Sequence, residues 1–514
     1  MAIDKLNINR ASLNAMSLTH DSPLNIEQIE RNFREIAPPL SKAEAILESN
    51  RCVYCYDAPC TRACPTHIDV PAFIKKIASE NLTGSARVIF DANPIGATCA
   101  RVCPVDVLCE GACVEKTLMA KPIEIGRLQR YATDYVMREK RDIFTAGQSN
   151  GKSVAVIGSG PAGLSCATYL ARLGYAVTIY DKKTFAGGLD TYGMAEYKMT
   201  QRVSIDEAAR VERLGVKFIM NTEIGLDVSF DDLEAAHDAI FLGAGLGATT
   251  RLNIPGEKLT GVYDALDFIE RIKTRDWAGV PIARTVAVIG AGNTAFDAVT
   301  QAKRLGAERV LLIYRRTSRE MPAYEYEYEL AKKDAVEFWW QTAPVEILAD
   351  EKGSHVAALR CVRMELGEPD ASGRRVASIA PGSEFNIPVE MIIKALGQQK
   401  MRPLLETIPD VKSDEAGRVI VNKATMQTNN PKYFAGGDCV NGGREAVDAA
   451  QMGKLAAQGI HKFVTGEDVE FAGARLPFIE KIYGEMEAAI PVASNNPAAS
   501  AESLGVKSYG NSSS

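Results

Sequence analysis

Two stretches of the 514-residue chain share a pattern that restricts how it can fold. Each starts with a run of β-branched residues, continues through a glycine-rich turn and a helical pattern, and ends in a second apolar run. The first stretch covers residues 152–183 and the second covers residues 284–316. The turns have the spacings Gly-x-Gly-x-x-Gly and Gly-x-Gly-x-x-Ala. Because this pattern is typical of dinucleotide-binding α/β domains, we expect two such domains.

The first turn predicts a bound dinucleotide. Gly158 permits the tight turn, Gly160 lets the backbone approach a pyrophosphate, and Gly163 allows the helix to pack closely on the strand. The helix N-terminus offers N–H groups and a positive dipole end to the phosphates. Asp181 ends the second strand, at the position where an acid binds ribose hydroxyls. We therefore expect a ligand here rather than a tight turn without one.

The second turn differs from the first at the end of its second strand. Gly290 and Gly292 open the turn, but Arg315 and Arg316 stand where the first stretch has an acid. Arginines can hold a 2′-phosphate in a bidentate manner or stack on adenine. The pair favours NADPH slightly over NADH, and two solvated arginines are the alternative.

A third motif lies late in the chain, where a short strand precedes Gly436, Gly437 and Asp438 and a helix follows. An aspartate in this place can bind the ribityl hydroxyls of a flavin, and the helix N-terminus would point toward the flavin ring. Because this motif returns to the first domain, we expect two nested folds. FAD is assigned to the outer fold and a nicotinamide nucleotide to the inner fold.

A cysteine-rich segment precedes both domains, with eight of the eleven cysteines between residues 52 and 113. The short spacings and two Cys-Pro pairs are typical of ligands of [4Fe–4S] clusters. A pair of structural zinc sites is the alternative, since zinc also binds closely spaced cysteines. The surrounding patterns predict an all-helical domain ending near residue 140, before a polar linker. The two groups are Cys52, Cys55, Cys60 and Cys64, and then Cys99, Cys103, Cys109 and Cys113.

Charge and hydropathy exclude several other classes of protein. The net charge of −6 does not favour a broad basic surface for nucleic acid. No apolar run reaches the ~18 residues of a transmembrane helix, and the N-terminus lacks the pattern of a signal peptide. We expect a cytoplasmic protein with no membrane or nucleic-acid partner.

Residues 25–465 resemble the glutamate synthase small-subunit family of flavoproteins, and within it the electron-input half of dihydropyrimidine dehydrogenase. The resemblance rests on "RCVYCYDAPCTRACPTHIDVPAFI", "IFDANPIGATCARVCPVDVLCEGAC", "PIEIGRLQRYATD", "VIGAGNTAFDAV" and "MQTNNPKYFAGGDCV". It implies two [4Fe–4S] clusters whose ligands interleave along the chain, with Cys99 as a bystander. The first set is Cys52, Cys55, Cys60 and Cys113, and the second is Cys64, Cys103, Cys109 and Gln129. Gln129 favours the pyrimidine enzyme, because glutamate synthase small subunits tend to carry an acid there.

The resemblance also implies further binding residues and no catalytic side chain, since hydride transfer to a flavin needs stacked rings rather than a general acid. A glutamate is commoner in the family at the position of Asp181. For the flavin it adds Pro161, Ala162, Gly188, Leu189, Lys198, Ile224 and Ala446 to the motif residues. For the nicotinamide nucleotide it adds Ala291, Asn293, Thr294, Ala395, Leu396 and Gly397.

These observations predict an α/β protein with a helical N-terminal iron–sulfur domain and two nested Rossmann-like domains. The expected boundaries are 1–145 for the extension and cluster domain, 151–262 and 395–465 for the FAD domain, 263–394 for the NAD(P) domain, and 466–514 for a disordered or partner-docking tail. The tail is too short for an FMN-binding (β/α)8 barrel.

The predicted function is oxidation of NAD(P)H through FAD and two clusters. The electron acceptor would be an FMN- and iron–sulfur-containing catalytic partner, in a hetero-oligomer, that reduces uracil or thymine. The small subunit of glutamate synthase and a general NAD(P)H:acceptor reductase are the alternatives among enzymes. A non-redox scaffold containing zinc is the alternative of a different class.

Overall fold

The computed structural model describes residues 24–119, 121–276, 279–369 and 375–471. These residues belong to one compact unit. The boundaries expected inside this unit therefore stay predictions, and the expected tail lies outside the described residues from 472 onward. None of the described helices is both long and apolar enough to cross a membrane.

The N-terminal part is helical, as the sequence predicts. Asp69 caps α5 by accepting a hydrogen bond from the Ala72 N–H, and Asn81 caps α6 through the Gly84 N–H. Two separate helices therefore form between the two cysteine groups. The α-helices are α2 (Ile26–Asn32), α3 (Lys42–Asn50), α4 (Pro59–Arg62), α5 (Val70–Ala78), α6 (Leu82–Ala92), α7 (Gly96–Val102), α8 (Glu115–Leu118) and α9 (Ile125–Arg138), with the 3-10 turn η2 (Val105–Val107).

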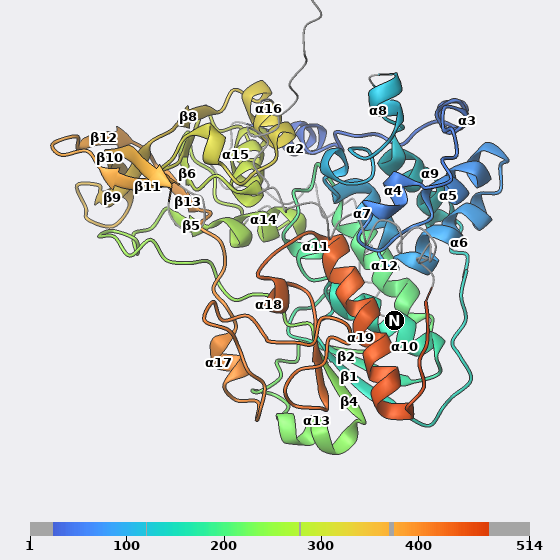
Figure 1. Ribbon diagram of the computed structural model, residues 1–514. Helices are drawn as coiled ribbons and strands as arrows, with labels where there is room; N and C mark the ends of the chain where they lie inside the picture. Colours follow the sequence, from blue (N-terminus) through green and yellow to red (C-terminus); the bar gives the residue numbers. More distant parts are fainter. Residues whose placement is uncertain (1–23, 120, 277–278, 370–374, 472–514) are drawn as a thin grey trace, which may run out of the picture. The chain divides into compact units, whose positions relative to one another are not determined.

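The first glycine motif opens a five-stranded parallel sheet of order β14-β4-β1-β2-β3. Figure 1 labels its strands β1, β2 and β4. The last strand in the chain, β14, pairs with β4, so the late motif returns to the first domain as expected. The strands are β1 (Ser153–Ile157), β2 (Ala176–Asp181), β3 (Lys217–Met220), β4 (Ala239–Leu242) and β14 (Tyr433–Ala435). The helices are α10 (Pro161–Arg172), α11 (Leu189–Tyr192), α12 (Gln201–Glu212), α13 (Phe230–Ala236), α17 (Arg402–Leu405), α18 (Asp438–Asn441) and α19 (Ala446–Thr465).

The second glycine motif opens another five-stranded parallel sheet, of order β5-β13-β6-β7-β8. Its elements are β5 (Val262–Asp264), α14 (Ala265–Lys273), β6 (Thr285–Ile289), α15 (Asn293–Arg304), β7 (Arg309–Ile313), η3 (Ser318–Glu320), α16 (Glu325–Lys333), β8 (Glu337–Trp339) and β13 (Met391–Lys394). An antiparallel sheet is inserted before β13 and consists of β9 (Thr342–Ala349), β10 (Val356–Pro369), β11 (Arg375–Ile379) and β12 (Phe385–Pro388). The nested α/β fold is thus confirmed.

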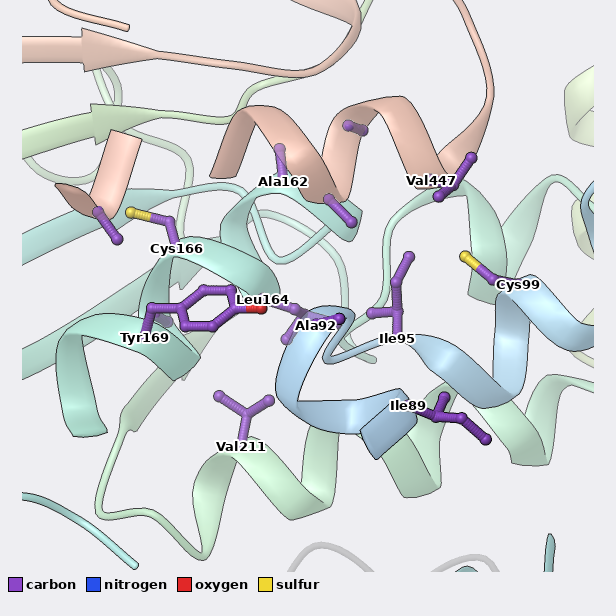
Figure 2. Close-up of a cluster of buried hydrophobic side chains, with 14 of the residues drawn as sticks. Ile89, Ala92, Ile95, Cys99, Ala162, Leu164, Cys166, Tyr169, Val211 and Val447 are labelled. Carbon is purple, nitrogen blue, oxygen red and sulfur yellow. The ribbon is translucent and has the colours of Figure 1, made fainter. Parts of the chain in front are cut away.

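One continuous apolar core joins the helical part to the first sheet (Figure 2). Ile95 and Cys99 of the helical part share it with Leu164 of α10 and Val447 of α19. Tyr169 of α10 adds a polar contact between the two parts, because its Oη donates a 2.8 Å hydrogen bond to the Asp91 carbonyl. The helices that border the first dinucleotide site are therefore packed directly against the cysteine-rich part.

Candidate functional site

A cavity of about 520 Å³ lies where the strands of the first sheet end. The cavity is lined by one residue at or just past the carboxyl end of each of four strands, β1, β2, β4 and β14. These residues are Gly158, Asp181, Gly243 and Gly437. Ligands of open α/β sheets bind at this edge. The cavity brings together these predicted flavin residues: Gly158, Gly160, Pro161, Ala162, Asp181, Gly188, Leu189, Ile224, Gly437, Asp438 and Ala446.

The three glycines of the first motif meet different surroundings. Gly158 has φ +96°, and a Cβ there would lie 2.3 Å from the Gly243 carbonyl oxygen. A Cβ on Gly163 would lie 2.0 Å from the Gly158 oxygen, so this residue packs the helix and does not line the cavity. The nearest atom to a Cβ on Gly160 is 3.8 Å away, which leaves bare backbone facing the cavity.

Asp181 has a second role besides lining the cavity. Its carboxylate accepts hydrogen bonds of 2.8 Å from the backbone N–H groups of Ser159 and Lys183. The acid therefore fixes the glycine-rich turn and the end of β2 relative to each other. It reaches the cavity from a position that its own loop already holds rigid.

Lys198 is not brought to the cavity with the other predicted flavin residues. Its ammonium is buried against α15 and α16, 2.6 Å from Oδ1 of Asp297 and in contact with Glu327. The structure therefore places Lys198 between the two dinucleotide domains, in an ion-pair cluster.

Sequence reasoning missed Asp190, an acid of the cavity wall. Asp190 is 2% exposed, and its Oδ1 has no hydrogen-bond partner within the described ranges. Burial raises the pKa of Asp190 well above its usual range, and the neighbouring charge of Glu207 adds to this. A neutral carboxyl is therefore favoured beside the cavity. Its position directly after Gly188 and Leu189 is the signal that could have pointed to it.

Glu445 is a second missed residue, and it connects the cavity to the nicotinamide domain. It lines the cavity just before α19, and its Oε1 accepts a 2.6 Å hydrogen bond from the Tyr324 hydroxyl. The Tyr324 N–H in turn donates to Oδ1 of Asn293, in the second glycine motif. Two hydrogen bonds thus link the cavity to the predicted nicotinamide loop.

The predicted nicotinamide residues gather where β6 and β13 end. Gly290 has φ +133°, and a Cβ there would lie 2.3 Å from the Ala395 carbonyl oxygen. The two backbones approach this closely only because Gly290 lacks a side chain. The same edge carries Ala291, Gly292, Asn293 and Thr294 from the turn, and Leu396 and Gly397 beyond β13.

The two predicted arginines have different surroundings. Arg315 is exposed at the end of β7, whereas Arg316 is 9% exposed and its Nε donates a 2.9 Å hydrogen bond to the Arg375 carbonyl. Arg316 is thus already used in holding β11. Of the two, only Arg315 is exposed, so the prediction of NADPH now rests on Arg315.

The eight clustered cysteines line two small cavities, and the cysteines of the first cavity are the first set that the resemblance implies. Burial raises the pKa of the Cys60 thiol to about 12, and the neighbouring Cys113 adds to this. In the described part of the chain no three His, Cys, Asp or Glu side chains are grouped as ligands of a single metal ion. The first cavity is lined by Cys52, Cys55, Cys60 and Cys113, and the second by Cys64, Cys99, Cys103, Cys109 and Gln129.

The second cavity contains one more candidate ligand than the predicted set. The Cys99 sulfur accepts a 3.2 Å hydrogen bond from Nδ2 of Asn93, and Gln129 donates through Nε2 to the Gly96 carbonyl. Both side chains border the same space. Which of them ligates a cluster stays a prediction.

Comparisons with known proteins agree with this geometry. Residues 29–141 match the family described as dihydropyrimidine dehydrogenase domain II, 4Fe-4S cluster, and residues 152–453 match pyridine nucleotide-disulphide oxidoreductase. The fold and site therefore define an NAD(P)H oxidoreductase with an iron–sulfur domain. The chain belongs to the pyridine nucleotide-disulphide oxidoreductase family, in the group that includes glutamate synthase small chains and dihydropyrimidine dehydrogenase subunits. An iron–sulfur domain is thus favoured over the zinc scaffold.

Two curated relatives from Escherichia coli illustrate this group. The chain is 37% identical over 452 residues to the glutamate synthase [NADPH] small chain, covering 85% of this chain and 95% of the relative. It is 33% identical over 432 residues to the NAD-dependent dihydropyrimidine dehydrogenase subunit PreT, covering 84% and 97%. Mycobacterium tuberculosis FprA in complex with NADPH shares the fold, with 18% identity, a TM-score of 0.51, and coverage of 66% of this chain and 90% of FprA.

Proposed function

We propose that this chain oxidises NAD(P)H with FAD and passes electrons through two [4Fe–4S] clusters to a catalytic partner subunit. The partner would contain FMN and iron–sulfur clusters and would reduce uracil or thymine at the 5,6 double bond. Bound FAD would supply the conversion between hydride and single-electron chemistry, and the protein aligns the groups and adjusts their potentials.

The observation that carries this proposal lies in the first turn of α19. Ala446 lines the 520 Å³ cavity, and the next residue, Val447, lines the second cysteine cavity. Successive residues of a helix point about 100° apart, so these two neighbours face two different cavities. The first turn of α19 therefore lies between the dinucleotide cavity and the second cysteine cavity. The first cysteine cavity receives no lining residue from α19. We infer that the second cysteine set lies next to the flavin.

The residues present fit the proposed groups. A Cβ on Gly188 would lie 2.8 Å from Cα of Gly160, so two bare backbone segments face each other where a pyrophosphate would bind. The unpartnered oxygen of Asp190 offers a further polar contact beside the cavity. In the cysteine cavities, the raised pKa of the Cys60 thiol favours its neutral form until a metal deprotonates it.

A partner subunit is supported by the names of the relatives, which are called a small chain and dehydrogenase subunits. Gln129 supports a pyrimidine-reducing partner, through the resemblance described above. The 37% identity with the glutamate synthase small chain supports that enzyme as the second candidate.

The test is an anaerobic assay of the purified chain. Iron, sulfide and flavin are quantified, NADH or NADPH is added, and flavin bleaching is followed. Uracil is then supplied with and without an FMN-containing pyrimidine subunit. Bleaching alone, with dihydrouracil formed only in the complete mixture, is the expected result. Bleaching without dihydrouracil would transfer the assignment to glutamate synthase or another acceptor, and absence of flavin would refute the proposal.

A further inference from the structure

Helix α19 carries a buried cation, Lys454, whose side chain contacts the cysteine-rich part of the chain. Lys454 follows Val447 by seven residues, so both lie on the same face of the helix. The Lys454 side chain is 4% exposed. Its Nζ donates hydrogen bonds of 2.9 Å to the carbonyl oxygens of Thr66 and Ala92, both in the cysteine-rich part.

These two carbonyls belong to segments that build the second cysteine cavity. Thr66 is two residues beyond Cys64, and its hydroxyl lies 3.4 Å from the Cys64 sulfur. Ala92 immediately precedes Asn93, which lines the cavity together with Cys64. The ammonium of Lys454 is therefore anchored to two segments whose neighbouring residues line the site, and it does not itself line the cavity.

A cation in this position is costly to bury. Burial lowers the pKa of Lys454 to about 8, while the charges of Cys64 and Asp91 act in the opposite direction. The amine thus remains mostly protonated at neutral pH. A main-chain carbonyl can be satisfied equally by a neutral amide donor, so anchoring alone does not explain a buried charge.

We propose that Lys454 is a positioning residue that holds a positive charge beside the second [4Fe–4S] cluster and raises its reduction potential. The inference rests on the proposed function. Reduction adds one negative charge to a cluster, and the net charge and hydrogen bonds around it set its potential. A fixed cation stabilises the reduced form more than the oxidised form. Lys454 would therefore favour transfer of electrons from the adjacent flavin cavity.

The test compares three variants of the holoprotein with the wild type by anaerobic redox titration monitored by EPR. Lys454→Gln keeps hydrogen-bond donors and removes the charge, Lys454→Met removes both, and Lys454→Arg keeps the charge. Lys462→Gln is the matched control, because Lys462 is exposed on the same helix and pairs with Asp468.

At a given solution potential, we expect the reduced-to-oxidised ratio of one cluster to fall about tenfold in Lys454→Gln and Lys454→Met. For a one-electron couple, this fall corresponds to a reduction potential lower by about 59 mV. The other cluster should keep its wild-type potential in all variants. In Lys454→Arg and Lys462→Gln, both clusters should keep their wild-type potentials. An unchanged potential in Lys454→Gln would overturn the proposal. So would an Arg variant that shifts as the Gln variant does, or loss of the second cluster's iron from the neutral variants, which would assign Lys454 to assembly of the site. Absence of clusters from the wild type would instead refute the proposed function.

Discussion

The side-chain nitrogen of Gln129 lies 2.7 Å from the carbonyl oxygen of Gly96 and donates a hydrogen bond to it. An amide has one nitrogen and one oxygen, so this bond leaves Oε1 of Gln129 as the atom available to the second cysteine cavity. Cys99, in the same cavity, accepts a hydrogen bond from Asn93. Gln129 stays the predicted fourth ligand, and Cys99 is the alternative that the cavity offers.

This arrangement predicts opposite outcomes for two substitutions. Gln129→Leu should alter or abolish the EPR signal of one cluster and lower the iron content, whereas Cys99→Ala should retain both signals. The measurement is iron and sulfide analysis with EPR of the dithionite-reduced proteins. The reverse pattern, with Cys99→Ala losing a cluster, would identify Cys99 as the ligand.

Gly160 and Gly163 should respond differently to the same added methyl group. A Cβ on Gly163 would lie 2.0 Å from the Gly158 oxygen, so Gly163→Ala should destabilise the domain by several kcal/mol, on the order of 3 kcal/mol or more. A Cβ on Gly160 meets nothing closer than 3.8 Å, so Gly160→Ala should fold and lose flavin affinity at least tenfold. Flavin titration and circular dichroism of the apoproteins separate the two effects. Full flavin retention by Gly160→Ala would show that the pyrophosphate does not bind against Gly160.

Nicotinamide preference should depend on one arginine of the predicted pair. Arg315→Ala should raise the KM for NADPH about tenfold and leave the KM for NADH nearly unchanged, because an exposed guanidinium is free to bind a 2′-phosphate. Arg316→Ala should change both constants similarly, because it removes the contact with the Arg375 carbonyl. Steady-state assays of NAD(P)H with ferricyanide as acceptor measure the ratio. An unchanged ratio in Arg315→Ala would mean that this residue does not contact the 2′-phosphate.

The nested folds could be predicted from local chemistry alone. The turns at Gly158 and Gly290 need a positive φ and a close approach to a neighbouring strand, and both demands restrict the residue type. The grouping of the cysteines, in contrast, depends on tertiary packing rather than on local chemistry. Cys60 and Cys113 line one cavity only because several helices pack between them, so spacing could not pair them.

The position of Lys198 shows where a family pattern stops being informative. The segment after α11 packs against α15 and α16, and Asp297 of α15 and Glu327 of α16 provide carboxylates for the Lys198 ammonium. Asp190 was missed although it directly follows Gly188 and Leu189, and Lys454 was missed because it lies outside the glycine and cysteine motifs. Their importance comes from burial beside a cavity, which a linear pattern does not reveal.

The last prediction concerns pH and an acid that connects α12 to the cysteine-rich part. Oε1 of Glu207 accepts a 2.7 Å hydrogen bond from the Ala97 N–H at the start of α7. Burial raises the pKa of Glu207 to about 7, although hydrogen bonds from Thr98 and Ala97 act in the opposite direction. The folded protein therefore binds this proton more tightly than the unfolded chain, whose glutamates titrate near 4.5.

For an acid with a raised pKa, the contribution to stability is complete below the unfolded value and is lost as pH rises to the folded value. The free energy of unfolding should thus fall by up to about 3 kcal/mol between pH 4.5 and 7 through Glu207 alone. Glu207→Gln should flatten this slope, while Glu212→Gln, at an exposed site on the same helix, should keep it. The urea concentration at half-release of the flavin, measured from pH 5 to 8, gives the three profiles. Parallel profiles for Glu207→Gln and the wild type would show that Glu207 keeps its ordinary pKa in the fold.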